Sequence, residues 1–402
     1  MKNKIYSLFL FCTALMVGQN ANAQCTGGRY LTEVFPNVTK TTVTYSSVYN
    51  LQMDIFQPTG DTYTQRPLII LAHGGSFVSG DRTNDVTVTQ LCNNFAKRGY
   101  VTVSIDYRLG SAIQLVLDSS YAIDEVIKAI SDGKAAIRYF MQDAATTNTY
   151  KIDTNNIFIG GNSAGAVLYM HVGYIDSMGE CPGYIQTAMN NNGGFEGNSG
   201  NAGYTTKSKA IINLAGALNE TSFVGPGNKP SANAQGTLDS TVPYYCYYPL
   251  NGSVHVNLCG LGSLEPVYVA NSINHVNTIF PGDGHVPWSS DASKFNTVDT
   301  MIINFLYSLV CGSTSVNEVA NNSEIVLYPN PAKELLHVSA PQAISGITVY
   351  DMTGRVVILN EGIHANTYEV NTTTLSKGMY FVRMNMGSGK DIIPVVKRIV
   401  IE

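Results

Sequence analysis

The feature that most constrains the fold is a serine held between two glycines, Gly161-Asn162-Ser163-Ala164-Gly165. An apolar run at 156–159 precedes it, and a helix-like stretch at 166–170 follows it. A strand that turns so sharply into a helix needs glycines beside the serine, because the neighbouring backbone then approaches without a Cβ in the way. The pattern predicts a nucleophilic hydroxyl at Ser163, with a purely structural turn as the alternative.

A second glycine-rich turn, His73-Gly74-Gly75-Ser76-Phe77, directly follows an expected strand at 67–72. Such a turn leaves backbone N–H groups unpaired and aimed at one point, which suits the oxyanion that forms when a hydroxyl attacks an ester carbonyl. We predict that Gly75 and Ser76 of this turn at 73–77, the donor turn, and Ala164 after the serine donate these N–H groups. An ordinary tight turn is the alternative.

A nucleophilic serine needs a general base, and the chain contains seven histidines. His285 is the best candidate, because it lies in a flexible segment at 282–287, after an expected strand at 277–280. We expect His255 and His275 to be surface or packing residues. The remaining histidines lie in the donor turn, in the helix after the serine, or in the C-terminal region: His73, His171, His337 and His364.

The imidazole in turn needs a carboxylate that fixes its tautomer and stabilises the imidazolium. Asp239 lies between Ser163 and His285 in the chain and is the predicted partner. Asp283 is the competitor. It precedes the histidine by only two residues, so its carboxylate would hardly reach the far ring nitrogen, and we interpret it as a turn former.

Short β-rich apolar runs alternate with helical stretches from about Thr41 to Cys311, which is typical of a mostly parallel sheet covered by helices. The segment 120–140 has apolar residues at helical spacing and predicts a covering helix. The segment 181–204 is rich in Gly and Asn and predicts a loop over the site. The expected strands are 67–72, 100–105, 156–159, 210–214 and 277–280.

The composition changes after Cys311, where small and polar residues predict a linker at 312–323. The remainder, 324–402, alternates short apolar segments with turn residues, which favours a small β-sandwich. Seven short strands are expected there: 325–328, 335–339, 347–350, 355–359, 367–370, 379–383 and 395–401.

The first 23 residues have the pattern of a signal peptide: Lys2 and Lys4, an apolar stretch, and a small-residue site at 21–23. The apolar stretch is shorter than the roughly 20 residues that span a bilayer, so no transmembrane segment is expected in the mature protein. With Cys12 in the removed segment, six cysteines remain in an exported chain, which favours disulfides over metal ligands. The expected pair is Cys246 with Cys259, although several cysteines could remain buried thiols.

The charge distribution excludes nucleic acid as a partner. The formal net charge is −5, and there is no run of Lys or Arg that could neutralise phosphates. At 402 residues the chain exceeds the size of one hydrophobic core, so two folded units are expected, a catalytic domain at 24–311 and a domain at 324–402.

From Tyr45 to about Phe305 the chain resembles the α/β-hydrolase esterases, especially the carboxylesterase and lipase-like members. The matching residues include the serine and donor-turn segments, with Gly80-Asp81. Ser76 stands where many members have a third glycine, and Gln235 where many have a histidine. The other matching segments are 51–58, 106–109, 236–244 and 282–287.

The last 80 or so residues resemble the sorting domain of the type IX secretion system of Bacteroidetes. The resemblance implies passage to the periplasm, export across the outer membrane by the type IX machinery, and secretion or attachment at the cell surface. The matching segments are 327–331, 349–355, 378–382 and 396–400.

These observations predict a secreted serine ester hydrolase with Ser163, Asp239 and His285 as its triad. No cofactor and no metal are expected, because acyl transfer through a serine needs neither. Acetyl or feruloyl esters of polysaccharides, simple carboxylic esters and lipids are all candidate substrates. Two other classes stay open: a serine peptidase of the same fold, and a non-catalytic surface binding protein on a hydrolase scaffold.

Overall fold

The computed structural model describes residues 25–311, 325–351, 356–386 and 393–402. The expected signal peptide and linker lie outside these ranges, as do the first residue of the expected strand 355–359 and part of the sorting motif 349–355. The chain divides into two compact units, Met1–Gly312 and Ser313–Glu402.

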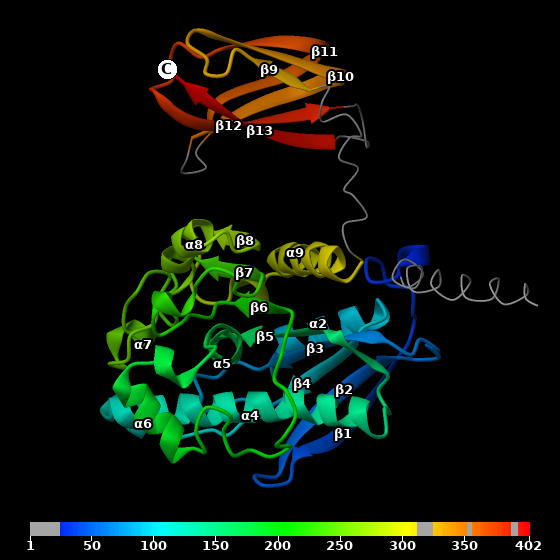
Figure 1. Ribbon diagram of the computed structural model, residues 1–402, viewed down its shortest axis with the longest axis vertical. Coiled ribbons are helices and arrows are strands. Elements are labelled where there is room, and N and C mark those ends of the chain that lie inside the picture. Colours follow the sequence, from blue (N-terminus) through cyan, green and yellow to red (C-terminus); the bar gives the residue numbers. More distant parts are fainter. Residues whose placement is uncertain (1–24, 312–324, 352–355, 387–392) are drawn as a thin grey trace, which may run out of the picture. The chain divides into compact units, whose positions relative to one another are not determined.

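The first unit is built on an eight-stranded sheet with the order β1-β2-β4-β3-β5-β6-β7-β8 (Figure 1). The strands from β4 to β8 run parallel, whereas β1 pairs antiparallel with β2 and β2 with β4. The expected mostly parallel sheet is therefore confirmed. The strands are β1 (Val38–Ser46), β2 (Leu51–Pro58), β3 (Arg66–Ala72), β4 (Val101–Ile105), β5 (Ile152–Asn162), β6 (Ala210–Leu214), β7 (Ser231–Gly236) and β8 (His275–Phe280).

Helices cover both faces of this sheet, which explains why the central strand β3 is buried along its whole length. Every residue of β3 is buried: Leu68 and Ile70 join the core under α4, α5 and α8, whereas Ile69 and Leu71 join the core under α2 and α9. The helices are α2 (Val86–Lys97), α3 (Ala112–Leu117), α4 (Ser119–Ala145), α5 (Ala164–Tyr174), α6 (Gly183–Asn191), α7 (Pro249–Gly252), α8 (Leu261–Ala270) and α9 (Ala292–Val310), with short 3₁₀ turns at Thr26–Gly28, Met178–Glu180, Thr221–Phe223 and Pro287–Ser289.

Aspartates begin three of the long helices by accepting backbone N–H groups that have no partner within the helix. Asp118 accepts from the first turn of α4, Asp291 from that of α9 and Asp85 from that of α2. The expected helix 120–140 is thus confirmed within α4, which is longer at both ends. In the described part of the chain, no helix is both long and apolar enough to cross a membrane.

One expectation for the first unit was wrong, and one strand was not predicted. The segment 181–204 is not all loop, because α6 occupies part of it and buries Ile185 and Met189. Strand β7 was missed because its sequence, SANAQG, is polar. Its Asn233 is fully buried and joins the amide side chains of Asn213 and Asn277 on the strands to either side, at 3.1 and 3.0 Å.

The second unit is a separate antiparallel sheet with a core of its own. Seven strands were expected, and the described residues form five. The expected strands 335–339 and 347–350 are parts of the long strand β10, and 355–359 and 367–370 fall largely within the long strand β11. Both long strands carry register shifts near their middle. The strands are β9 (Val326–Tyr328), β10 (Leu335–Tyr350), β11 (Val356–Asn371), β12 (Gly378–Met386) and β13 (Ile393–Ile401).

Two disulfides join parts of the first unit. Cys246 pairs with Cys259, as expected, and Cys25 pairs with Cys311, which ties the start of the described chain to the end of α9. Cys92 and Cys181 are free and buried. Burial raises the pKa of both thiols, that of Cys181 to about 11, so neither is ionised at neutral pH.

Candidate active site

Ser163 lies in the sharp turn between β5 and α5. Its φ of 56° and ψ of −119° fall in a region that few residues with a side chain adopt. The flanking glycines allow the turn to sit against the end of β3: a Cβ on Gly165 would lie 2.1 Å from the Ala72 carbonyl oxygen, and one on Gly161 would lie 2.4 Å from it. The glycine spacing in the sequence is therefore a packing requirement.

The structure brings Ser163, His285 and Asp239 into one hydrogen-bonded row. The Ser163 hydroxyl donates to His285 Nε2 at 2.8 Å, and His285 Nδ1–H donates to Asp239 Oδ2 at 2.7 Å. The Asp239 carboxylate is fully buried, whereas the imidazole is 20 % exposed. A carboxylate on Nδ1 leaves the lone pair of Nε2 directed at the serine hydroxyl.

Asp239 is held in place by its own loop, after the end of β7. Its second oxygen, Oδ1, accepts the backbone N–H groups of Thr241 and Val242, both at 3.0 Å. Gln235, at the residue where many α/β-hydrolase esterases carry histidine, is buried and fastens the same loop: its amide donates to the Val242 carbonyl and accepts from the Leu261 N–H, both at 2.8 Å.

The donor turn after β3 has its backbone in the left-handed region at three successive residues, with φ of 122° at Gly75, 53° at Ser76 and 62° at Phe77. Only glycine fits the first of these, because a Cβ there would lie 2.0 Å from the Ser79 carbonyl oxygen. Among the hydrogen bonds within the described residues, none uses the backbone N–H of Gly75, Ser76 or Ala164. These three groups are available to a substrate oxygen.

His73 supports this turn and does not face the serine. Its Nδ1–H donates to the Gly74 carbonyl at 2.6 Å, and its ring stacks on Tyr107 with the ring centroids 4.2 Å apart. The Tyr107 hydroxyl donates to the His73 carbonyl at 2.9 Å. Burial lowers the pKa of His73, so it stays neutral at neutral pH.

The competing residues lie elsewhere. Asp283 forms an ion pair with Lys294 at 2.6 Å, and His275 donates from Nδ1 to the Ile273 carbonyl at the start of β8. His255 is exposed, and its ring lies tilted against that of Tyr248 with the centroids 5.4 Å apart. None of the three makes a hydrogen bond to Ser163 among the described residues.

Three residues that the sequence analysis did not single out connect the loops of the site. Asn162 donates from its amide to Asp85 Oδ2 at 3.1 Å and accepts from the Trp288 indole N–H at 3.2 Å. Asp85 Oδ2 also accepts the Gly74 N–H at 2.8 Å. The sequence holds two signs of their importance. Asn162 directly precedes the serine in the Gly161–Gly165 motif, and Trp288, the only tryptophan of the chain, follows His285 by three residues.

No group of three or more His, Cys, Asp or Glu side chains that could hold a metal ion occurs in the described residues.

Two family models match the chain. Residues 53–243 match the family described as BD-FAE, and residues 326–402 match the family described as secretion system C-terminal sorting domain. No curated protein matches the chain.

Solved structures of Thermogutta terrifontis esterase 2 are similar to the first unit in fold. The native enzyme is 19% identical, with a TM-score of 0.50 over 70% of this chain and 95% of that one. The apo form is 20% identical, with a TM-score of 0.50 over 70% and 97%. The form phosphonylated by cyclosarin is 19% identical, with a TM-score of 0.50 over 68% and 95%.

The fold and the family matches together define an α/β-hydrolase of the carboxylic ester hydrolase class. A segment that matches the BD-FAE family is followed in the chain by one that matches the secretion system C-terminal sorting domain. The sorting domain indicates export, with secretion or attachment at the cell surface, and implies the type IX machinery as a partner.

Proposed function

We propose that this protein is a secreted serine esterase in which Ser163 attacks the ester carbonyl, His285 transfers the proton and Asp239 orients the imidazole. The observation that carries the proposal is the hydrogen-bonded row Ser163–His285–Asp239, with distances of 2.8 and 2.7 Å. Such a row activates a hydroxyl that is otherwise a weak nucleophile.

In the first half-reaction, Ser163 Oγ bonds to the carbonyl carbon while its proton passes to His285 Nε2. The carbonyl oxygen becomes an oxyanion that accepts the N–H groups of Gly75, Ser76 and Ala164. The bond from the carbonyl carbon to the alkoxy oxygen then breaks, and the imidazolium gives its proton to the leaving alcohol.

In the second half-reaction, water attacks the acyl-serine and gives a proton to His285 Nε2. The acid leaves as that proton returns to Ser163 Oγ, so the enzyme is regenerated with no net change. Acetyl and feruloyl esters of polysaccharides, expected from the sequence, belong in the substrate panel beside simple aryl esters.

Covalent labelling with paraoxon tests the nucleophile, because the relative Thermogutta terrifontis esterase 2 is phosphorylated by this compound. We expect one diethylphosphoryl group per chain, located by peptide mass spectrometry on Ser163, with loss of hydrolysis of p-nitrophenyl butyrate. Ser163→Ala should take up no label, and the exposed Ser253→Ala should behave as the wild type. Full labelling and turnover in Ser163→Ala would overturn the proposal.

A further inference from the structure

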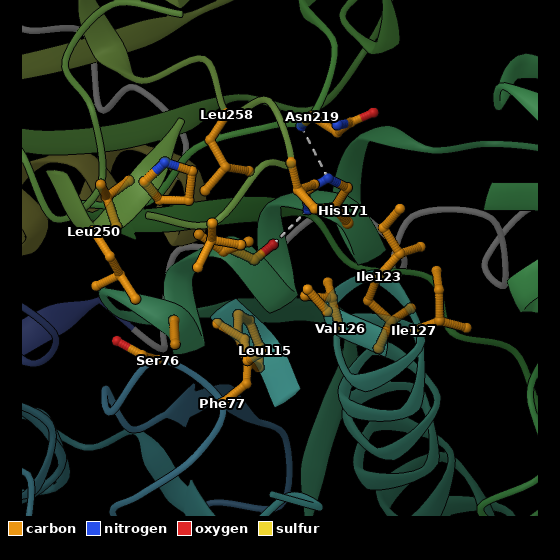
Figure 2. Close-up of a pocket in the computed structure, with 18 of the residues that line it drawn as sticks. Ser76, Phe77, Leu115, Ile123, Val126, Ile127, His171, Asn219, Leu250 and Leu258 are labelled. Atoms are coloured by element: carbon orange, nitrogen blue, oxygen red, sulfur yellow. Dashed lines mark hydrogen bonds between the residues drawn. The ribbon is translucent and has the colours of Figure 1, made fainter. Parts of the chain in front are cut away.

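An apolar pocket begins at Ser163 and runs between α4, α5 and the segment after α7 (Figure 2). The centre of a water-sized sphere can occupy about 100 Å³ of it, and the wider hollow measures about 840 Å³ when open solvent at its mouth is included. Figure 2 shows Ile123, Val126 and Ile127 reaching into it from α4, opposite Leu250 and Leu258. The exposed protein atoms of its wall are nearly all carbon.

The pocket is deep as well as apolar. Ala164, Val167 and His171 line it from successive turns of α5. At a rise of 1.5 Å per residue, the seven steps from Ala164 to His171 cover about 10 Å. An extended chain of roughly eight carbons has this length at ordinary carbon–carbon bond lengths.

The polar groups at the far end are already engaged. His171 donates from Nδ1 to the Val167 carbonyl at 2.8 Å and accepts the Asn219 N–H on Nε2 at 3.1 Å. The Asn219 amide accepts from the Tyr184 hydroxyl at 3.1 Å and donates to the Asn257 carbonyl at 2.8 Å. Burial lowers the pKa of His171 to about 4, so this end is uncharged at neutral pH.

This wall discriminates between acyl groups. Each buried methylene of an aliphatic chain gains about 0.8 kcal/mol. A feruloyl ring would bring a phenol hydroxyl and a methoxy oxygen to a surface with few free partners, and burying a polar group without a partner is unfavourable.

The chemistry assigns the pocket to the acyl side of the ester. His285 must give its proton to the leaving alkoxy oxygen, so the alcohol lies beside the imidazole. His285 does not line the pocket, whereas Ser76, Ser163 and Ala164 do. The group that extends into the pocket from the attacked carbon is therefore the acyl chain.

We propose that this pocket binds unbranched aliphatic acyl groups of about six to eight carbons and makes the enzyme selective for their esters over acetyl and feruloyl esters. The proposal rests on the proposed function and adds the identity of the acid that the enzyme releases. It differs from the polysaccharide acetyl and feruloyl esters expected from the sequence.

The test compares kcat/KM of the full-length enzyme on p-nitrophenyl acetate, butyrate, hexanoate, octanoate and ferulate. Full burial of each methylene would raise kcat/KM about fourfold, so we expect hexanoate to exceed acetate by at least tenfold, and ferulate to fall below hexanoate. A profile that is flat, or highest for acetate or ferulate, would overturn the proposal.

A filled pocket gives the second measurement. Val126→Phe should lower kcat/KM on octanoate at least tenfold and leave acetate within threefold, because the added ring occupies the space of the chain. Val256→Phe fills the pocket from the opposite wall and is measured in the same way if Val126→Phe does not fold. Val269→Phe is the matched control, since Val269 is 65% exposed on α8 and does not line the pocket.

The two proposals fail in different ways. Equal losses on octanoate and acetate in a folded Val126→Phe would reject the acyl pocket while leaving a working esterase. Hydrolysis of the whole series by Ser163→Ala at the wild-type rate would instead reject the proposed function.

Discussion

The Trp288 indole N–H donates a hydrogen bond to Asn162 Oδ1, 3.2 Å away, and so joins the loop of His285 to the turn of Ser163. The amide of Asn162 donates to Asp85, and Asp85 accepts the N–H of Gly74 in the donor turn. Four side-chain and backbone groups therefore set the spacing of the three loops that meet at the serine.

Trp288→Phe keeps an aromatic ring but removes the N–H, so we expect kcat to fall about tenfold to hundredfold, because small misplacements of reacting groups have effects of this size. KM should change less than threefold, since Trp288 does not line the pocket. Steady-state kinetics and the melting temperature check this. A loss confined to thermal stability would show that the hydrogen bond has no positioning role.

Asp239→Asn should lower kcat by about 10⁴-fold, because the amide no longer fixes the imidazole tautomer. His285→Ala should be worse, at about 10⁶-fold. Asp283→Asn is the control, and we expect activity within threefold of the wild type, because Asp283 pairs with Lys294. A greater loss in Asp283→Asn than in Asp239→Asn would transfer the carboxylate role to Asp283.

The two disulfides should differ in what they stabilise. Cys25 and Cys311 are 286 residues apart and Cys246 and Cys259 only 13, so the loop-entropy relation gives about 6 and about 3 kcal/mol. The double alanine variant of the first pair should therefore melt at the lower temperature.

The second pair encloses a wall of the pocket, which includes Leu250, Val254 and Leu258. Its double alanine variant should lose octanoate hydrolysis more than acetate hydrolysis. An equal loss of activity on both esters would show that this loop has no role in selecting the length of the acyl chain.

His171 predicts a pH dependence of stability. Its folded-state pKa of about 4 lies below the ordinary value of 6.5, so the unfolded chain takes up the proton first as the pH falls. Stability should decline from about pH 6.5 towards pH 4, by about 3 kcal/mol from this residue. Melting temperatures across this range should fall less steeply in His171→Gln than in the wild type. The exposed His255→Gln is the control and should keep the wild-type slope.

Removal of residues 312–402 tests the division of the chain. We expect a chain that ends at Cys311 to keep full activity on soluble aryl esters, because all residues of the candidate site and both disulfides lie before that point. In the native host the truncated enzyme should accumulate in the periplasm, since it lacks the sorting domain. If the truncated enzyme lost activity on insoluble polymer but kept it on soluble esters, the C-terminal domain would instead have a substrate-binding role.

The class of fold and the sorting domain could be predicted from the amino-acid sequence alone. The fold rests on local signals, namely apolar runs buried on two faces, such as 67–72, and glycines that a sharp turn requires on either side of Ser163. The sorting domain rests on short motifs such as 327–331. The order of Ser163, Asp239 and His285 in the chain also led to the prediction of a triad, and these residues are hydrogen-bonded in a row in the structure. Their roles stay predictions.

The polar strand β7 could not be predicted from the sequence in this way. Strand β7 is buried with a ladder of amides, in which Asn233 bonds to Asn213 and Asn277 on the strands to either side. Periodicity of apolar residues carries no sign of such a strand.

The surroundings of the serine depend on contacts between segments that are distant in the sequence. Asp85, Asn162 and Trp288 come from three separate segments, and their hydrogen bonds exist because the carboxyl ends of the parallel strands β3, β5 and β8 lie at the same edge of the sheet. The pocket likewise combines α4, α5 and the loop closed by Cys246 and Cys259. Its depth and apolar wall depend on how distant segments pack together, which no local pattern in the sequence records.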